Sequence, residues 1–281
     1  YNDDLRAYPK FERERYHYSL FNCCQGMYQL GSPYWEQFFP RTARTLVDDL
    51  ALAADGSLVG VCVHGSAVLG DFIPGASDLD VLVVVEDDVD DALLDRVTDT
   101  LASDRSMPAT GLEASVVART AAASPAKPWP FRVHVTTAPE DRKVVSGRTH
   151  SGDPDLVLHY AVARERGWSA TGPPPTELFG SLPTSIVLEQ IADELRWAAD
   201  NGSASYAVLN ACRALCFSLE GRICSKSQGG EWALLRGIEP QLVAAALDAR
   251  AQGTRPPPDP VAKRWVLAAA DDIRHRLQSS L

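Results

Sequence analysis

The sequence lacks a long apolar run. No apolar run reaches the roughly 20 residues of a bilayer-spanning helix, and from the polar, aromatic first residues we expect no signal peptide. It also lacks a basic surplus, since 27 Lys and Arg face 37 Asp and Glu and the net charge is −10. That balance disfavours a nucleic-acid backbone as the main partner and is compatible with a cationic small molecule. We expect a cytoplasmic protein.

Metal-ligand spacing is absent from the cysteines and histidines. None of the six cysteines forms a C-x-x-C pair, so no zinc framework is predicted and buried, reduced thiols are expected. His64, His150 and His159 are scattered along the chain, and we expect them to be structural or solvated. His134 is the exception, because it lies in a predicted strand that could turn it toward a functional site.

Aromatic residues are concentrated at the start of the chain. Residues 1–55 hold 11 of the chain's aromatic side chains, which comprise 8 Phe, 8 Tyr and 6 Trp. Helical patterns cover 11–28 and 34–52, with a Gly-Ser-Pro break between them. We interpret this region as a helical extension packed on the next domain. A wall for a substrate pocket is the alternative.

Residues 56–150 read as a small mixed sheet with flanking helices. Apolar runs bounded by turn residues predict strands at Leu58–Val63, Leu79–Val85, Leu112–Ala118 and 131–135. A helix is predicted at 89–101, where acidic residues at its start suit the helix dipole. A loop rich in Ala and Pro is expected at 121–130, and the sheet is expected to close near Pro139.

The remaining residues, 151–281, predict a helical domain. Asp153 followed by Pro154 is a typical helix start, and the helix is expected to run to about Arg166. Helical patterns follow at 186–199, 204–220, 230–235, 240–251 and 260–277, with short connections between them. The fold class is therefore α+β: a mixed-sheet domain with an N-terminal helical extension and a C-terminal helix bundle.

The chemistry is concentrated between residues 61 and 86. Gly65 and Ser66 follow the first strand, and glycine lets a backbone approach an anion closely while exposed N–H groups and a hydroxyl hold phosphate oxygens. Asp78 and Asp80 stand at the mouth of the second strand, two residues apart. A pair of carboxylates together with substrate phosphates is the usual setting for Mg²⁺. The pattern predicts a phosphate and metal site, and capping of a turn is the alternative.

Gly65-Ser66 followed by Ser77-Asp78-Leu79-Asp80 resembles the signature of the DNA-polymerase-β-like nucleotidyltransferases. Further segments resemble the streptomycin/spectinomycin adenylyltransferases of that superfamily, which pair this domain with a helical bundle. They are residues 111–116, 153–156, 171–179, 209–213, 221–226 and 231–233. The resemblance covers about 58–250.

The resemblance implies roles at the matching positions. Asp78 and Asp80 would hold Mg²⁺ with the phosphates of ATP, and Glu113 would be the base on the acceptor hydroxyl. Gly65, Ser66 and Ser77 would contact phosphate, and Asp155, Arg213 and Lys226 would reach the nucleotide from the helical half.

Four of these residues also have an interpretation from the chain alone, and Lys226 taken alone would be a surface lysine. A carboxylate such as Glu113 is unexpected in a buried strand, so it is either exposed at the sheet's end or functional. Arg213 lies in an otherwise apolar helix, where it needs an anion, either a phosphate or a partner such as Glu220. Asp155 taken alone would be a first-turn acid favoured by the helix dipole.

The predicted activity is transfer of AMP from ATP to a hydroxyl of an aminoglycoside-like or other sugar-containing molecule, with release of pyrophosphate. The acceptor residues of the streptomycin-modifying enzymes are not matched, because Ala199, Ser203 and Tyr206 align with their acidic helix start. Glu194 and Asp200 could build a different acceptor pocket. The alternatives are a protein or RNA acceptor, and a nucleotide-binding relative without catalysis.

Overall fold

The computed structural model of the protein describes residues 32–105, 107 and 109–279, with side chains from Ala43 onward. The predicted helix at 11–28 and the aromatic residues of the N-terminal extension fall outside these limits. The predicted helix at 34–52 is present as α2 (Ser32–Ala53). Within the described part of the chain, no helix is both long and apolar enough to cross a membrane.

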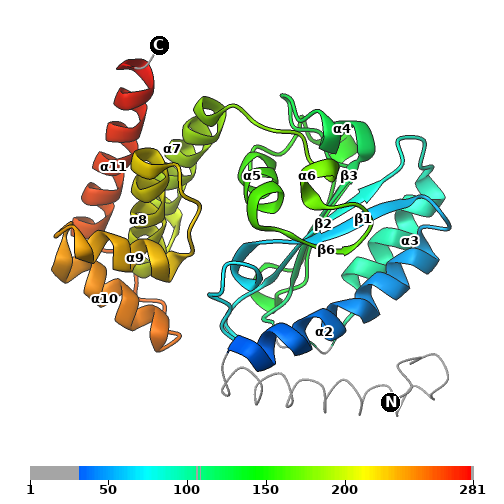
Figure 1. Cartoon of the computed structure of the whole chain (residues 1–281), viewed down its shortest axis with the longest axis horizontal. Coiled ribbons are helices and arrows are strands. Elements are labelled where there is room, and N and C mark those ends of the chain that lie inside the picture. Colours follow the sequence, from blue (N-terminus) through cyan, green and yellow to red (C-terminus); the bar gives the residue numbers. More distant parts are fainter. Residues whose placement is uncertain (1–31, 106, 108, 280–281) are drawn as a thin grey trace. The chain divides into compact units, whose positions relative to one another are not determined.

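A six-stranded mixed sheet is formed by strands that lie between residues 58 and 171 (Figure 1). The strand order is β5-β4-β3-β2-β1-β6, in which β2 and β3 pair in parallel and the other four neighbouring pairs are antiparallel. The strands are β1 (Leu58–Val63), β2 (Leu79–Val85), β3 (Leu112–Ala118), β4 (Val133–Thr136), β5 (Lys143–Ser146) and β6 (Trp168–Thr171). The first three have the bounds that the sequence predicts, because each is a long apolar run between turn residues.

One face of this sheet is covered by two helices. Alternate residues of β1 to β4 form a continuous apolar layer against α2 and α3 (Asp91–Ala102), which lie side by side along the sheet (Figure 1). Leu50, Val97 and Leu101 are fully buried in that layer. In each strand, the residues between those of the apolar layer point to the opposite face of the sheet, because strand side chains alternate. That face carries the polar residues described below.

The sheet extends further than the sequence predicts. The expected closure near Pro139 is wrong, because β5 pairs with β4 beyond that point. It is an exposed edge strand of four residues, too short and too polar to give an apolar signal. The sequence also predicts only helices after residue 150, yet β6 pairs with β1. The four residues of β6 are all half-buried, so buried and exposed side chains do not alternate along it.

Contacts divide the chain into two compact units. The first runs to Asp153 and includes Gly167–Phe179, and the second comprises Pro154–Arg166 and the residues from Gly180 onward. The first unit contains the sheet, α2, α3, the short helices α4 (Arg119–Ala123) and α6 (Pro175–Leu178), and the turns η2 (Gly65–Ala67), η3 (Pro139–Asp141) and η4 (Gly147–Thr149). α4 begins before the loop expected at 121–130 and ends within it.

The second unit is the predicted helix bundle. Its helices are α5 (Leu156–Arg166), α7 (Thr184–Asn201), α8 (Ala204–Glu220), α9 (Lys226–Leu235), α10 (Pro240–Ala251) and α11 (Pro260–Ser279). α8 is the centre of its core, with 10 buried residues. The side chain of Ser203 caps the start of α8, and Gly221 ends it in the left-handed conformation. A capping box of Ser225 and Gln228 starts α9 earlier than the predicted Gly230.

Candidate active site

Gly65 and Ser66 lie where β1 ends, in the turn η2. Gly65 has a φ of +64°, a left-handed conformation that glycine adopts without strain. The N–H of His64 donates to the carbonyl oxygen of Asp80 at 3.0 Å, which joins this turn to β2. A Cβ added to Gly65 would lie 2.5 Å from Cγ of Asp80. The missing side chain therefore lets the Asp80 carboxylate lie directly against the backbone of the turn.

Asp80 and Glu113 are aligned partners on the parallel strands β2 and β3. Aligned residues on neighbouring strands point to the same face of a sheet, with strands about 4.8 Å apart. Both residues are half-buried, near the start of their strands. The fold thus brings Asp80, one of the two predicted metal ligands, beside the predicted base Glu113, although the two residues are 33 positions apart in sequence (113 − 80).

Ser77 and Asp78 belong to the loop that leads into β2. The N–H of Ile73 donates to Oγ of Ser77 at 3.0 Å, and the N–H of Ser77 donates to the carbonyl oxygen of Ile73 at 2.8 Å. Ser77 therefore closes this loop with its N–H and its Oγ. The proton of its hydroxyl could still donate a hydrogen bond to a phosphate. Asp78 is half-buried at the mouth of β2, separated from Asp80 by the buried Leu79.

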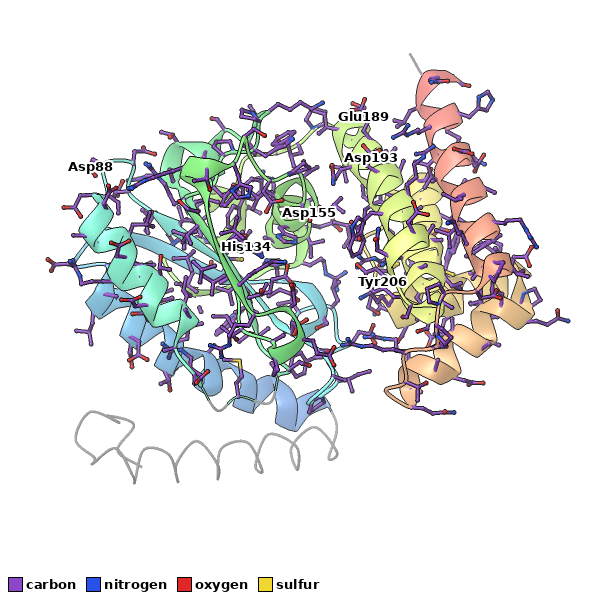
Figure 2. The ribbon with its side chains drawn as sticks, turned by 180° about the vertical axis from the view of Figure 1, so that it is seen from behind. Asp88, His134, Asp155, Glu189, Asp193 and Tyr206 are labelled. Carbon is purple, nitrogen blue, oxygen red and sulfur yellow. The ribbon has the colours of Figure 1, made fainter. Side chains whose placement is uncertain are left out.

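His134 lies on the same face of the sheet as the two aligned carboxylates. In the antiparallel pair of β3 and β4, Glu113 is opposite Thr136 and Ser115 is opposite His134. Oγ of Ser115 and Nδ1 of His134 are 2.9 Å apart. Ser115 is 2% exposed, so this hydrogen bond fixes the ring of His134 (Figure 2) from inside the sheet. The expectation that His134 could turn toward the site thus agrees with the register of β4.

A second group of polar side chains lies in the helical unit. Tyr206 of α8 donates its hydroxyl proton to Oε1 of Glu194 at 2.9 Å. Nζ of Lys226, the first residue of α9, lies 4.4 Å from the centre of the Tyr206 ring. Asp155, just before α5, accepts from Nε2 of Gln190 at 3.3 Å (Figure 2). Tyr206 therefore joins a carboxylate on α7 to a lysine on α9.

The pKa of Glu194 shows what surrounds it. Burial raises the pKa of this carboxyl above its usual value, and the hydrogen bond from Tyr206 works in the opposite direction. The charge of Asp155 raises the pKa further, while Arg213 and Lys226 lower it. All three predicted nucleotide contacts of the helical half thus lie near Glu194. The sequence names Tyr206 and Glu194 only as acceptor candidates, because their partnership depends on how α7 packs against α8.

Arg213 is half-buried on α8, and its predicted alternative partner is engaged elsewhere. Glu220 accepts from Nε1 of Trp232 at 2.7 Å and forms ion pairs with Arg222 and Arg236. Its pKa is lowered mainly by the hydrogen bond from Trp232. An ion pair between Arg213 and Glu220 is therefore not what holds this arginine.

The donor set fits a site made of two carboxylates and a substrate. No group of three or more His, Cys, Asp or Glu side chains among the described residues could hold a metal ion. Asp78 and Asp80 supply two carboxylates. A cation held there would therefore take its other ligands from phosphate and water, which is how Mg²⁺ is usually bound. The close approach of Asp80 to the Gly65 turn places a carboxylate beside the predicted phosphate-binding groups, as such a site requires.

Comparison with solved structures gives the same architecture. The structure is similar to the crystal structure of the spectinomycin adenyltransferase AAD(9) from Enterococcus faecialis with ATP and spectinomycin. The TM-score is 0.60 with 18% sequence identity, over 84% of this chain and 98% of that chain. At this identity the similarity establishes the fold. A search of curated proteins gave no match.

Two family models match the chain in the order of its two units. Residues 49–113 match the nucleotidyltransferase domain, a range that includes Gly65, Asp80 and Glu113. Residues 177–255 match the family described as aminoglycoside adenylyltransferase, C-terminal domain, a range that includes Arg213 and Lys226. The chain thus joins a nucleotidyltransferase domain, which indicates an enzyme of the EC 2.7.7 type, to a helical domain that is similar to the C-terminal domain of the aminoglycoside adenylyltransferases.

Proposed function

We propose that the protein transfers AMP from ATP to a hydroxyl of an aminoglycoside-like small molecule and releases pyrophosphate. The observation that carries this proposal is the alignment of Asp80 with Glu113 beside the Gly65 turn. The similar spectinomycin adenyltransferase was crystallised with ATP and spectinomycin, which supports this donor and this class of acceptor. The net charge of −10 favours an acceptor that carries positive charge.

Each residue of the sheet site has a part in the proposed reaction. Glu113 accepts the proton of the acceptor hydroxyl, whose oxygen then bonds to the α-phosphorus of ATP. The bond from that phosphorus to the bridging oxygen of the β-phosphate breaks, and pyrophosphate leaves. The backbone of the Gly65 turn, with the hydroxyls of Ser66 and Ser77, holds phosphate oxygens. Asp78 and Asp80 would hold a Mg²⁺ ion, which supplies neutralisation of the phosphate charge.

The helical unit supplies the remaining nucleotide contacts in this proposal. Arg213 and Lys226 neutralise phosphate charge, and Asp155 contacts the nucleotide. The cation–π contact with Tyr206 fixes the ammonium group of Lys226, which lowers the entropy lost when a phosphate binds. We also propose a cytoplasmic location, because ATP is the donor and the four cysteines of the described residues are buried and unbridged.

The direct test is incubation of the protein with Mg²⁺ and each nucleoside triphosphate against spectinomycin, streptomycin and related aminoglycosides. Mass spectrometry should detect acceptor carrying one added AMP, together with an equal amount of pyrophosphate. Absence of a modified acceptor across the panel would refute the proposed acceptor class. Modification of a protein or an RNA in parallel reactions would establish the alternative acceptor.

Two substitutions test the assigned residues. Glu113→Gln keeps the shape of the side chain and removes the base, so kcat should fall by about 10²–10⁴-fold. Asp80→Asn removes a charge from the metal pair and should abolish turnover. Circular dichroism and thermal unfolding of each variant serve as controls for folding. Full activity in either variant would contradict its assigned role.

A further inference from the structure

Several polar side chains surround Glu113 on its face of the sheet. Asp80 of β2 and Thr136 of β4 are its aligned partners on the adjacent strands. Ser115 is the next residue of β3 on this face, because strand side chains alternate. His134 is opposite Ser115 on β4 and is therefore the diagonal neighbour of Glu113. Diagonal neighbours in an antiparallel pair lie within reach of each other when their side chains are long or aromatic.

Three of these neighbours are poor donors to a carboxylate. The carboxylate of Asp80 only accepts hydrogen bonds. The hydroxyl of Thr136 donates to a backbone carbonyl oxygen in the turn η3, and the hydroxyl of Ser115 is paired with Nδ1 of His134. The imidazole of His134 carries a ring N–H group. His134 is thus the neighbour on this face that is suited to hold the carboxylate of Glu113 in one orientation.

The bond to Ser115 sets which ring nitrogen of His134 carries the proton. Oγ of Ser115 and Nδ1 of His134 are 2.9 Å apart, an ordinary hydrogen-bond distance. Ser115 is 2% exposed, so its hydroxyl is shielded from bulk water. When that hydroxyl donates to Nδ1, the proton of the neutral ring lies on Nε2. Nε2 can then donate to a carboxylate, in a bond roughly twice as strong as one between neutral groups.

We propose that His134 is a positioning residue for the base Glu113. Ser115 donates to Nδ1, and Nε2 donates to one oxygen of the Glu113 carboxylate. The other oxygen is then aimed at the acceptor hydroxyl and accepts its proton. The bond from Nε2 tightens in the substrate complex, because the hydrogen bonds of catalytic groups are often long or misaligned before substrate binds. The inference rests on the proposed function, and it adds the residue that orients its base.

Stabilisation of the sheet is the competing explanation for His134. Its bond to the buried Ser115 joins β4 to β3, and this bond adds stability whether or not Nε2 meets Glu113. In this alternative, a change at Nε2 leaves the reaction rate unaltered, and loss of the bond at Nδ1 lowers the free energy of unfolding. The two explanations therefore give importance to different nitrogens of one ring.

Two substitutions separate the roles of the ring nitrogens. The amide of asparagine stands as many bonds from Cα as Nδ1 does, and the amide of glutamine as many as Nε2 does. With ATP and the modified aminoglycoside of the panel above, His134→Asn should lower kcat by about 10- to 100-fold and leave both KM values unchanged. His134→Gln should keep kcat within about threefold of the unaltered protein. His150→Asn is the matched control, because His150 is an exposed histidine whose Nδ1 contacts the backbone oxygen of Ser146.

Nitrogen-15 NMR of the histidine rings measures the tautomer directly. At a pH where the ring is neutral, Nε2 of His134 should carry the proton, and the signals that vanish in His134→Gln identify this ring. A proton on Nδ1 would overturn the proposal. Full kcat in His134→Asn would overturn it in favour of the stabilising role, as would equal losses of kcat in both variants that follow their losses of Tm.

The NMR measurement separates this proposal from the proposed function. It needs no turnover and no variant with altered stability other than the one used for assignment. A missing AMP transfer would refute the proposed function while the tautomer of His134 is still measured. Conversely, AMP transfer with a proton on Nδ1 would leave the proposed function standing and remove His134 from it.

Discussion

Substitution of Gly65 by alanine tests whether the turn after β1 and the Asp80 carboxylate form one structure. Two effects act on the variant. Gly65 has a φ of +64°, where an alanine costs about 1–2 kcal/mol. The new Cβ would also lie 2.5 Å from Cγ of Asp80 and closer still to Oδ2. The first effect lowers stability, and the second displaces a residue of the proposed site.

The size of the displacement follows from the contact. An ordinary contact for a Cβ begins at 3.4 Å, so Cγ of Asp80 or the turn itself must move by about 0.9 Å (3.4 − 2.5). A misplacement of about 1 Å at a reacting centre costs on the order of 10²-fold in rate. We therefore expect kcat/KM of Gly65→Ala to fall by about 10²-fold, which corresponds to about 2.7 kcal/mol of transition-state stabilisation.

The assay pairs pyrophosphate release with thermal unfolding. A loss of about 1–2 kcal/mol should lower Tm by roughly 2–8 °C in a protein of this size. Gly56→Ala is the matched control, since Gly56 has a φ of +84° and nothing within 4 Å of an added Cβ. It should show a similar fall in Tm with unchanged kcat/KM.

A specific pattern of results would refute the reasoning. If Gly65→Ala lost stability but kept full activity, the position of Asp80 would not matter for the reaction. If both alanine variants lost activity in proportion to their loss of stability, the catalytic loss would come from partial unfolding. Only a catalytic loss confined to Gly65→Ala supports the proposed site.

Two further predictions concern the helical unit. Burial raises the pKa of Glu194, so its folded form holds a proton more tightly than its unfolded form, and stability is lost as the pH rises through the folded pKa. Glu194→Gln should therefore raise Tm at pH 8, with the gain shrinking toward pH 4, and a gain that grows on acidification would contradict this. Gly229→Ala should lower the urea midpoint even though alanine normally stabilises a helix by about 1 kcal/mol, because its Cβ would lie 2.7 Å from the backbone nitrogen of Arg213. A raised midpoint would show that α8 and α9 can separate without cost.

Long, buried elements can be predicted from this sequence, and short, half-buried ones cannot. β1, β2 and β3 are apolar runs of six or seven residues, and their bounds were predictable because turn residues mark both ends. β5 and β6 have four residues each and no buried face, so neither carries a periodic signal. They are strands because a neighbouring strand supplies their hydrogen-bond partners, which is a tertiary effect.

Some residues of the candidate site can likewise be predicted from local sequence, whereas their arrangement in space cannot. Residue type and spacing along one hairpin are enough to predict Gly65, Ser66, Asp78 and Asp80 as site residues. Glu113 is predicted as a site residue because a carboxylate is unexpected in a buried strand and because of the family resemblance. Its alignment with Asp80 required the parallel pairing of β2 with β3, which no local pattern encodes.

The sequence alone predicts a phosphate and metal site, because a Gly-Ser turn and two carboxylates lie within one short stretch of chain, and the resemblance of that stretch predicts nucleotidyl transfer. Tertiary structure alone decided the surroundings of these groups. Packing of α7 against α8 joins Tyr206 to Glu194, and the pairing of β3 with β4 joins Ser115 to His134. Residues far apart in sequence become neighbours only when apolar faces are buried, so their chemistry cannot be read from spacing along the chain.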